Sequence, residues 1–132
     1  MNYFKLDGNK FSLEGMEKLA LNGNVEAATR VGRYYGKKAK INAEYYEKSI
    51  SFFLLGANVG CKDCMINVSK NALKYGKYLT ANKLEGDYRM YFRLALDYAF
   101  KAFSNSSIRT QKHLVRSLTA IKKYDVKIDI IH

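Results

Sequence analysis

Residues 22–40, "NGNVEAATRVGRYYGKKAK", decide the fold, because their pattern returns twice further along the chain. Residues 59–77, "VGCKDCMINVSKNALKYGK", align with them at a shift of 37, and residues 105–123, "NSSIRTQKHLVRSLTAIKK", follow at a further shift of 46. The alignment pairs Gly23 with Gly60, Ala27 with Cys64, and Val31 with Val68. A period of this length is typical of helical repeat proteins.

The intervening segments repeat as well. Residues 45–60, "YYEKSISFFLLGANVG", and 91–106, "YFRLALDYAFKAFSNS", lie 46 apart, and their apolar residues recur at intervals of three and four, the helical period. We therefore predict an all-α chain forming one helical-repeat domain over residues 1–132. It comprises an entry helix at 12–22, helix pairs at about 24–58 and 61–104, a final helix at 107–123 and a tail at 125–132.

The two ends of the chain have a different pattern. Residues 3–11, "YFKLDGNKF", favour a small hairpin around Asp7 and Gly8. Residues 126–131, "VKIDII", alternate like a short strand or like a tail that docks on the rest of the chain.

Residues 20–35 and 42–60 resemble the Sel-one-like repeat, a relative of the tetratricopeptide repeat. In that family a glycine ends one helix, a small residue follows four positions later, a Leu-Gly pair lies in the next helix, and a Lys-Ala plus aromatic pair marks the second helix. These roles fall to Gly23, Ala27, Val31 with Gly32, and Lys48 with Ser49, Phe52 and Phe53. The resemblance covers roughly residues 12–123 and implies a short right-handed α-solenoid of about three helix-turn-helix repeats.

The later copies depart from this pattern. Ser69 and Val115 take the place of the mid-helix glycine, and the loop at 77–87 is longer than its counterpart at 40–42. We therefore expect looser or turned helix packing there.

Glycine and aromatic residues indicate how the helices pack. A glycine inside a helix costs about 0.5–1 kcal/mol relative to alanine, so Gly32 predicts the close approach of a neighbouring helix. Large side chains then fill the space between hairpins, namely Tyr45, Phe52, Phe53, Tyr91 and Tyr98. The alternative for these aromatic residues is a platform for stacking nucleic-acid bases.

The chain carries a net charge of +11, which attracts nucleic acid, anionic membranes or acidic proteins but does not determine the fold. The longest apolar block, at residues 52–57, is too short for a membrane span, and the first residues lack the apolar region of a signal peptide. We expect a soluble, cytoplasmic protein.

The basic residues recur on one side of the repeated helices. Arg33, Lys37 and Lys40 are spaced i, i+4 and i+7, opposite the apolar positions. The second copy repeats the row with Lys70, Lys74 and Lys77, and the third supplies Arg109, Lys112, Arg116 and Lys123. In solenoids that this chain resembles, the first helix of each hairpin lines the concave face that holds a partner.

These rows predict a basic concave groove. We expect a non-enzymatic protein–protein interaction module, an adaptor, scaffold or inhibitor-type binder, that holds an acidic protein or peptide segment. Its predicted contact residues are Arg33, Lys37, Lys40, Lys70, Lys74, Lys77, Lys112 and Arg116. The alternatives are a nucleic-acid-binding protein that uses the same residues on phosphates, and a solvated face without a ligand. The apolar end faces of a three-repeat array predict either capping by residues 125–132 or self-association.

Cys61 and Cys64 have the C-x-x-C spacing of a redox dithiol or half of a metal site. The repeat register gives the other interpretation, since it places Cys64 on the small-residue position of Ala27 and Cys61 on the position of Asn24. No second pair of metal ligands, phosphate loop or nucleophile elbow accompanies them. We therefore expect no enzymatic activity, no metal and no cofactor.

Overall fold

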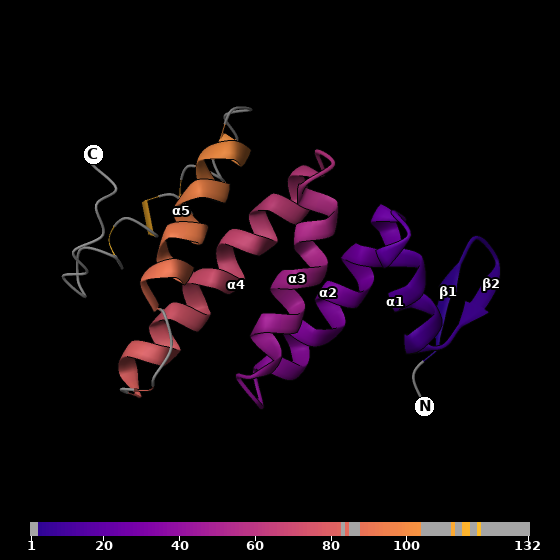
Figure 1. Cartoon of the computed structure of the whole chain (residues 1–132), viewed down its shortest axis with the longest axis horizontal. Coiled ribbons are helices and arrows are strands. Elements are labelled where there is room, and N and C mark those ends of the chain that lie inside the picture. Colours follow the sequence, from indigo (N-terminus) through magenta and orange to yellow (C-terminus); the bar gives the residue numbers. More distant parts are fainter. Residues whose placement is uncertain are drawn as a thin grey trace. The chain divides into compact units, whose positions relative to one another are not determined.

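The computed structural model describes residues 3–82, 84, 88–103, 112, 115, 116 and 119. Its elements are β1 (Phe4–Leu6), β2 (Asn9–Phe11), α1 (Leu13–Leu21), α2 (Val25–Ala39), α3 (Tyr45–Ala57), α4 (Lys62–Ala81) and α5 (Tyr88–Phe103) (Figure 1). The prediction of a mainly helical chain is confirmed. The predicted final helix at 107–123 and the tail at 125–132 lie outside the described residues, apart from four positions of the helix.

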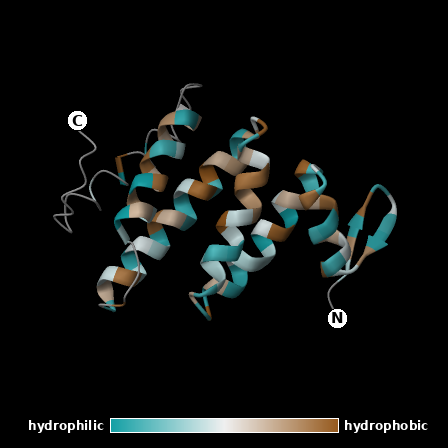
Figure 2. Ribbon diagram, viewed as in Figure 1, coloured by the Kyte–Doolittle hydropathy of each residue, from teal (hydrophilic) through white to brown (hydrophobic). Residues whose placement is uncertain are grey.

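The chain divides into two compact units, Met1–Cys64 and Met65–His132, which we call the N-terminal and the C-terminal unit. The division falls within the first turn of α4. Each helix carries both hydrophilic and hydrophobic residues (Figure 2). In the ranges that the structure describes, none of these helices combines the length and apolarity that a membrane span requires.

The predicted N-terminal hairpin is confirmed. β1 and β2 pair antiparallel, with Phe4 opposite Phe11 and Leu6 opposite Asn9. Asp7 and Gly8 form the connecting turn with φ angles of 52° and 82°, as a two-residue turn with two left-handed positions requires. Leu6 is buried in the N-terminal core, and the Arg30 side chain of α2 donates a hydrogen bond to the Lys5 carbonyl oxygen. The hairpin is thereby fixed to α2.

Local capping sets the beginnings of α1 and α2. The Ser12 hydroxyl accepts a hydrogen bond from the Gly15 N–H at 3.1 Å, and the Asn24 amide oxygen accepts one from the Ala27 N–H at 2.9 Å. Serine and asparagine are favoured at this position because their side chains satisfy N–H groups that lack helical partners. The Ser12 cap thus starts α1, and the Asn24 cap separates α2 from α1.

Gly23 and Gly60, which the sequence alignment pairs, form equivalent turns. Their φ angles are 101° and 96°, in the left-handed region that favours glycine after a helix. In both turns the glycine N–H donates to the carbonyl three residues earlier, at 3.0 and 3.1 Å, and the next N–H donates to the carbonyl five residues earlier, at 3.0 Å. The first two copies of the repeat therefore begin alike.

α2 and α3 approach each other closely at Gly32. A Cβ atom at this position would lie 2.8 Å from the ring of Phe53, which is itself fully buried. The Ser49 hydroxyl of α3 donates a hydrogen bond to the Gly32 carbonyl oxygen at 2.6 Å. The close helix approach predicted from this glycine is confirmed.

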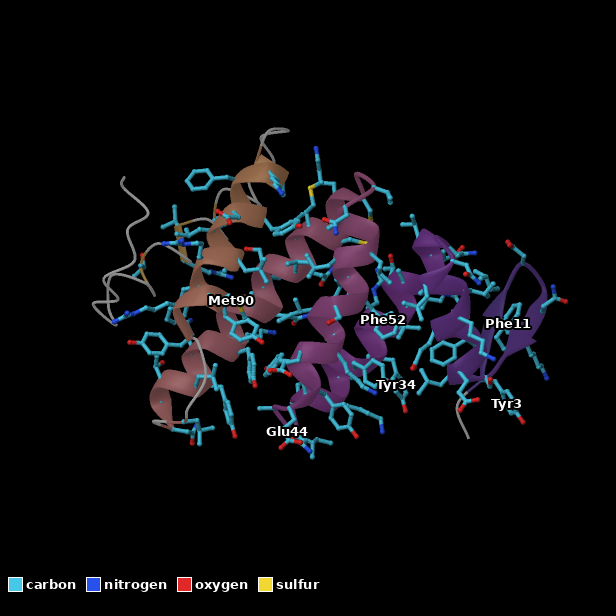
Figure 3. All side chains as sticks on the ribbon, in the orientation of Figure 1. Tyr3, Phe11, Tyr34, Glu44, Phe52 and Met90 are labelled. Carbon is cyan, nitrogen blue, oxygen red and sulfur yellow. The ribbon has the colours of Figure 1, made fainter. Side chains whose placement is uncertain are left out.

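The core of the N-terminal unit joins residues of the hairpin and the first two helices. Its buried members are Leu6, Met16, Ala20, Ala27, Ala28, Val31 and Tyr35. Partly buried side chains pack around them, including Phe11, Tyr34 and Phe52, which Figure 3 labels. The small alanines of α2 let the neighbouring elements approach, and the partly buried aromatic side chains cover the edge of the core.

The C-terminal unit packs α4 against α5 by the same means at different positions. A Cβ atom on Gly76 would lie 2.7 Å from the ring of Phe92, which has no exposed surface. The buried hydroxyl of Ser69 donates a hydrogen bond to the Ala95 carbonyl oxygen. The Ser69 hydroxyl thus bonds directly to the facing backbone, and the looser or turned packing expected in the later copies stays a prediction.

Candidate interaction surface

Arg33, Lys37 and Lys40, which we call the α2 stripe, are all exposed, and the intervening Tyr35 is buried. At 100° per residue the three side chains fall within an arc of about 60°, along about 10 Å of helix axis. Among the described residues, no acidic side chain forms an ion pair with them. α2 thus presents a row of three cations on one side.

Lys70, Lys74 and Lys77, the α4 stripe, are less uniform. Lys74 and Lys77 are exposed, whereas Lys70 is half-buried. Next to them Tyr78 is 39% exposed, and its ring stacks on Tyr75 at a centroid distance of 6.3 Å. This helix therefore combines cations with an exposed aromatic ring.

Lys112 and Arg116 are exposed helical residues. The α2 stripe belongs to the N-terminal unit, whereas the α4 stripe, Lys112 and Arg116 belong to the C-terminal unit. The structure thus brings the predicted residues together within each stripe. The single groove that the sequence predicts for all of them stays a prediction.

Sequence reasoning missed a cluster of aromatic rings and lysines on α2 and α3. The Tyr35 ring stacks on Tyr45 at 5.7 Å and on Phe52 at 6.0 Å. The ammonium of Lys38 lies 5.6 Å from the Tyr45 ring centroid and 5.2 Å from that of Tyr34, and the Lys48 ammonium lies 5.1 Å from that of Tyr35. A cation and the face of an aromatic ring attract each other. The paired tyrosines at 34–35 and 45–46, on either side of the α2–α3 turn, were the available signal.

Tyr35 also connects this cluster to α1. Its hydroxyl donates to the Glu17 carboxylate, with oxygen–oxygen distances of 3.2 and 3.3 Å. Burial, followed by the negative charge of Glu17, raises the pKa of Tyr35 to about 12, because both disfavour a tyrosinate. The phenol stays protonated at neutral pH and acts as a structural link.

The aromatic residues predicted as core divide into two groups. Phe53, Tyr91 and Tyr98 are buried, which supports the packing role. Tyr45 and Phe52 are only partly buried, and both belong to the stacked cluster around Tyr35.

Cys61 and Cys64 lie at the beginning of α4. The Cys61 sulfur accepts a hydrogen bond from the Cys64 N–H at 3.3 Å, so Cys61 caps α4 as its repeat counterpart Asn24 caps α2. Cys64 has no exposed surface and contacts the Thr29 hydroxyl at 3.2 Å. Burial raises the pKa of the Cys64 thiol to about 12. A capping side chain binds the N–H three residues later, which is also the separation of the two cysteines in C-x-x-C. Helix capping therefore accounts for this spacing.

In the part of the chain that the structure describes, no three His, Cys, Asp or Glu side chains gather into a possible metal site. Comparison with protein-family models, with curated proteins and with solved structures gives no match.

Proposed function

We propose that the chain is a non-enzymatic interaction module that binds an acidic segment of another protein through its basic stripes. The observation that carries this proposal is the α2 stripe, three exposed cations in a row with no ion-pair partner among the described residues. Lys74 and Lys77 of the α4 stripe add two exposed cations in the C-terminal unit. The Sel-one-like resemblance agrees with an adaptor class of protein.

The spacing of the α2 stripe suits a peptide ligand. Arg33 and Lys37 are about 6 Å apart along the helix axis, and Lys37 and Lys40 about 4.5 Å. Alternate side chains of an extended strand are about 7 Å apart, so acidic residues at every second position fall close to successive cations. Individual exposed ion pairs contribute only about 0.2–1 kcal/mol, so several must act together, and they also speed association.

Nucleic-acid binding is the second candidate, and the α4 stripe favours it. Tyr78 is partly exposed beside Lys74 and Lys77, an arrangement in which a base stacks on the ring while the amines contact phosphates. The α2 stripe favours the protein ligand instead. The nearby rings of Tyr34 and Tyr45 lie under the Lys38 ammonium, which takes up one face of each ring.

Affinity capture tests the proposal. The wild type, Arg33→Glu/Lys37→Glu and Lys74→Glu/Lys77→Glu are immobilised and exposed to cell lysate, and the retained proteins are identified by mass spectrometry. Lys10→Glu/Lys18→Glu is the matched control, because it makes the same charge change at exposed positions of β2 and α1.

We expect acidic proteins to be retained by the wild type and the control and to be depleted at least about tenfold on both stripe variants. Nuclease treatment of the lysate should leave this retention unchanged. Equal retention on all four proteins, or loss after nuclease, contradicts the proposal.

A further inference from the structure

Cys61 and Cys64 are in contact at the beginning of α4 through a capping hydrogen bond. The Cys61 sulfur accepts a hydrogen bond from the Cys64 N–H at 3.3 Å. Both are free thiols in this structure. The capping contact therefore places the Cys61 sulfur beside the backbone of Cys64, one helical turn along the chain.

The two thiols differ in access. Cys61 is only partly buried, whereas Cys64 has no exposed surface. Cys64 packs against the α3 backbone so closely that a Cβ atom on Gly56 would lie 2.4 Å from its sulfur. An oxidant from solvent therefore meets Cys61 first, and Cys64 is reached only through Cys61.

We propose that Cys61 and Cys64 form a reversible intramolecular disulfide by exchange with a small disulfide of the glutathione class. Cys61 is the attacking sulfur and Cys64 is the resolving sulfur. This inference is independent of the proposed binding function, since it concerns neither basic stripe.

Two exchange steps balance the reaction. Cys61 loses its proton to solvent, and its thiolate attacks one sulfur of the oxidised glutathione, so that a mixed disulfide forms and one glutathione thiolate leaves. Cys64 then loses its proton, and its sulfur attacks the Cys61 sulfur, which releases the second glutathione thiolate. Two protein thiols are oxidised to a disulfide, and one glutathione disulfide is reduced to two thiols that take up the two protons.

The surroundings of each sulfur fit these roles. Cys61 is only partly buried, so a small disulfide can reach its sulfur from solvent. The Thr29 hydroxyl already donates its only proton to the Val25 carbonyl oxygen at 2.9 Å, so its contact with Cys64 is accepted from the thiol S–H. Burial raises the pKa of the Cys64 thiol to about 12, so Cys64 enters the reaction as a thiol.

The test is exchange in the folded, full-length protein. Wild type, Cys64→Ala and Cys61→Ser are incubated with excess oxidised glutathione, quenched with acid at intervals and analysed by intact mass and peptide mapping. Cys64→Ala is a conservative change because alanine occupies the equivalent position, Ala27, in the first copy. Circular dichroism checks that each variant is folded.

We expect the wild type to lose two hydrogens and both free thiols, and dithiothreitol to restore them. Cys64→Ala should stop with one glutathione on Cys61, and Cys61→Ser should react at least about tenfold more slowly than the wild type. If a variant does not fold, the wild-type time course alone tests whether the Cys61–Cys64 disulfide forms in the folded protein. A wild type that stays reduced, accumulates the glutathione adduct, links two chains, or closes the disulfide only in urea overturns the proposal.

Discussion

The Ser49 hydroxyl on α3 donates a hydrogen bond to the Gly32 carbonyl oxygen on α2, and the second helix pair contains the same bond with the helices exchanged. There Ser69 on α4 donates to the Ala95 carbonyl oxygen on α5. The sequence shifts equate Gly32 with Ser69 and Ser49 with Ala95. Each pair thus keeps one serine and one smaller residue at the same contact, on opposite helices.

Replacing either serine should remove a buried hydrogen bond. We expect Ser49→Ala and Ser69→Ala each to lower the free energy of unfolding by about 0.5–1.5 kcal/mol, measured by urea denaturation. Ser51→Ala is the control, because its exposed hydroxyl bonds to the Glu47 carbonyl within the same helix. Its effect should stay within about 0.5 kcal/mol. Equal losses for all three variants contradict a special role for the interhelical bonds.

Gly32→Ala should destabilise the protein although alanine is the better helix former. The added Cβ would meet the buried Phe53 ring at 2.8 Å, and overpacking of this kind costs about 1–3 kcal/mol, against a propensity gain of about 1 kcal/mol. Gly15→Ala in α1 is the matched control, since its Cβ finds only ordinary contacts at 3.5 Å. Urea denaturation should show a lower midpoint for Gly32→Ala and an unchanged or higher one for Gly15→Ala. The reverse order would show that α2 and α3 do not meet at Gly32.

Tyr35 predicts a loss of stability in alkaline solution. Its pKa rises from 10.0 to about 12 in the folded state, so the unfolded chain releases this proton more readily. The contribution of the Tyr35 phenol to the free energy of unfolding is complete below pH 10 and disappears as the pH rises towards 12. The difference in free energy of unfolding between wild type and Tyr35→Phe should therefore narrow over this interval. A difference independent of pH contradicts the buried link to Glu17.

The turns were predictable because a single residue determines each of them. Gly23, Gly60 and the pair Asp7–Gly8 adopt left-handed conformations that few residues tolerate, so their positions in the sequence indicate the turns directly. Gly32 was predictable for a similar reason, since an unexplained glycine inside a helix indicates a close neighbour.

Other features depend on tertiary contacts that the repeat pattern does not encode. Ser69 departs from the glycine pattern, but its partner Ala95 lies 26 residues away, so the hydrogen bond was invisible in the sequence. The stacking of Tyr35 on Tyr45 and Phe52 likewise follows from side-chain direction, which periodicity does not give. For the candidate site, helical spacing predicted the shared face of the α2 stripe, whereas the half-burial of Lys70 depends on neighbours in space.

The most direct test of the central claim compares two labelled ligands by fluorescence anisotropy at near-physiological salt. These are a glutamate-rich peptide, and an oligonucleotide in single- and double-stranded form. We predict that the wild type and Lys10→Glu/Lys18→Glu bind the peptide, that Arg33→Glu/Lys37→Glu binds it at least about tenfold more weakly, and that neither oligonucleotide binds at micromolar protein. Micromolar or tighter oligonucleotide binding that Arg33→Glu, Lys70→Glu and Arg116→Glu weaken, without peptide binding, would contradict the account.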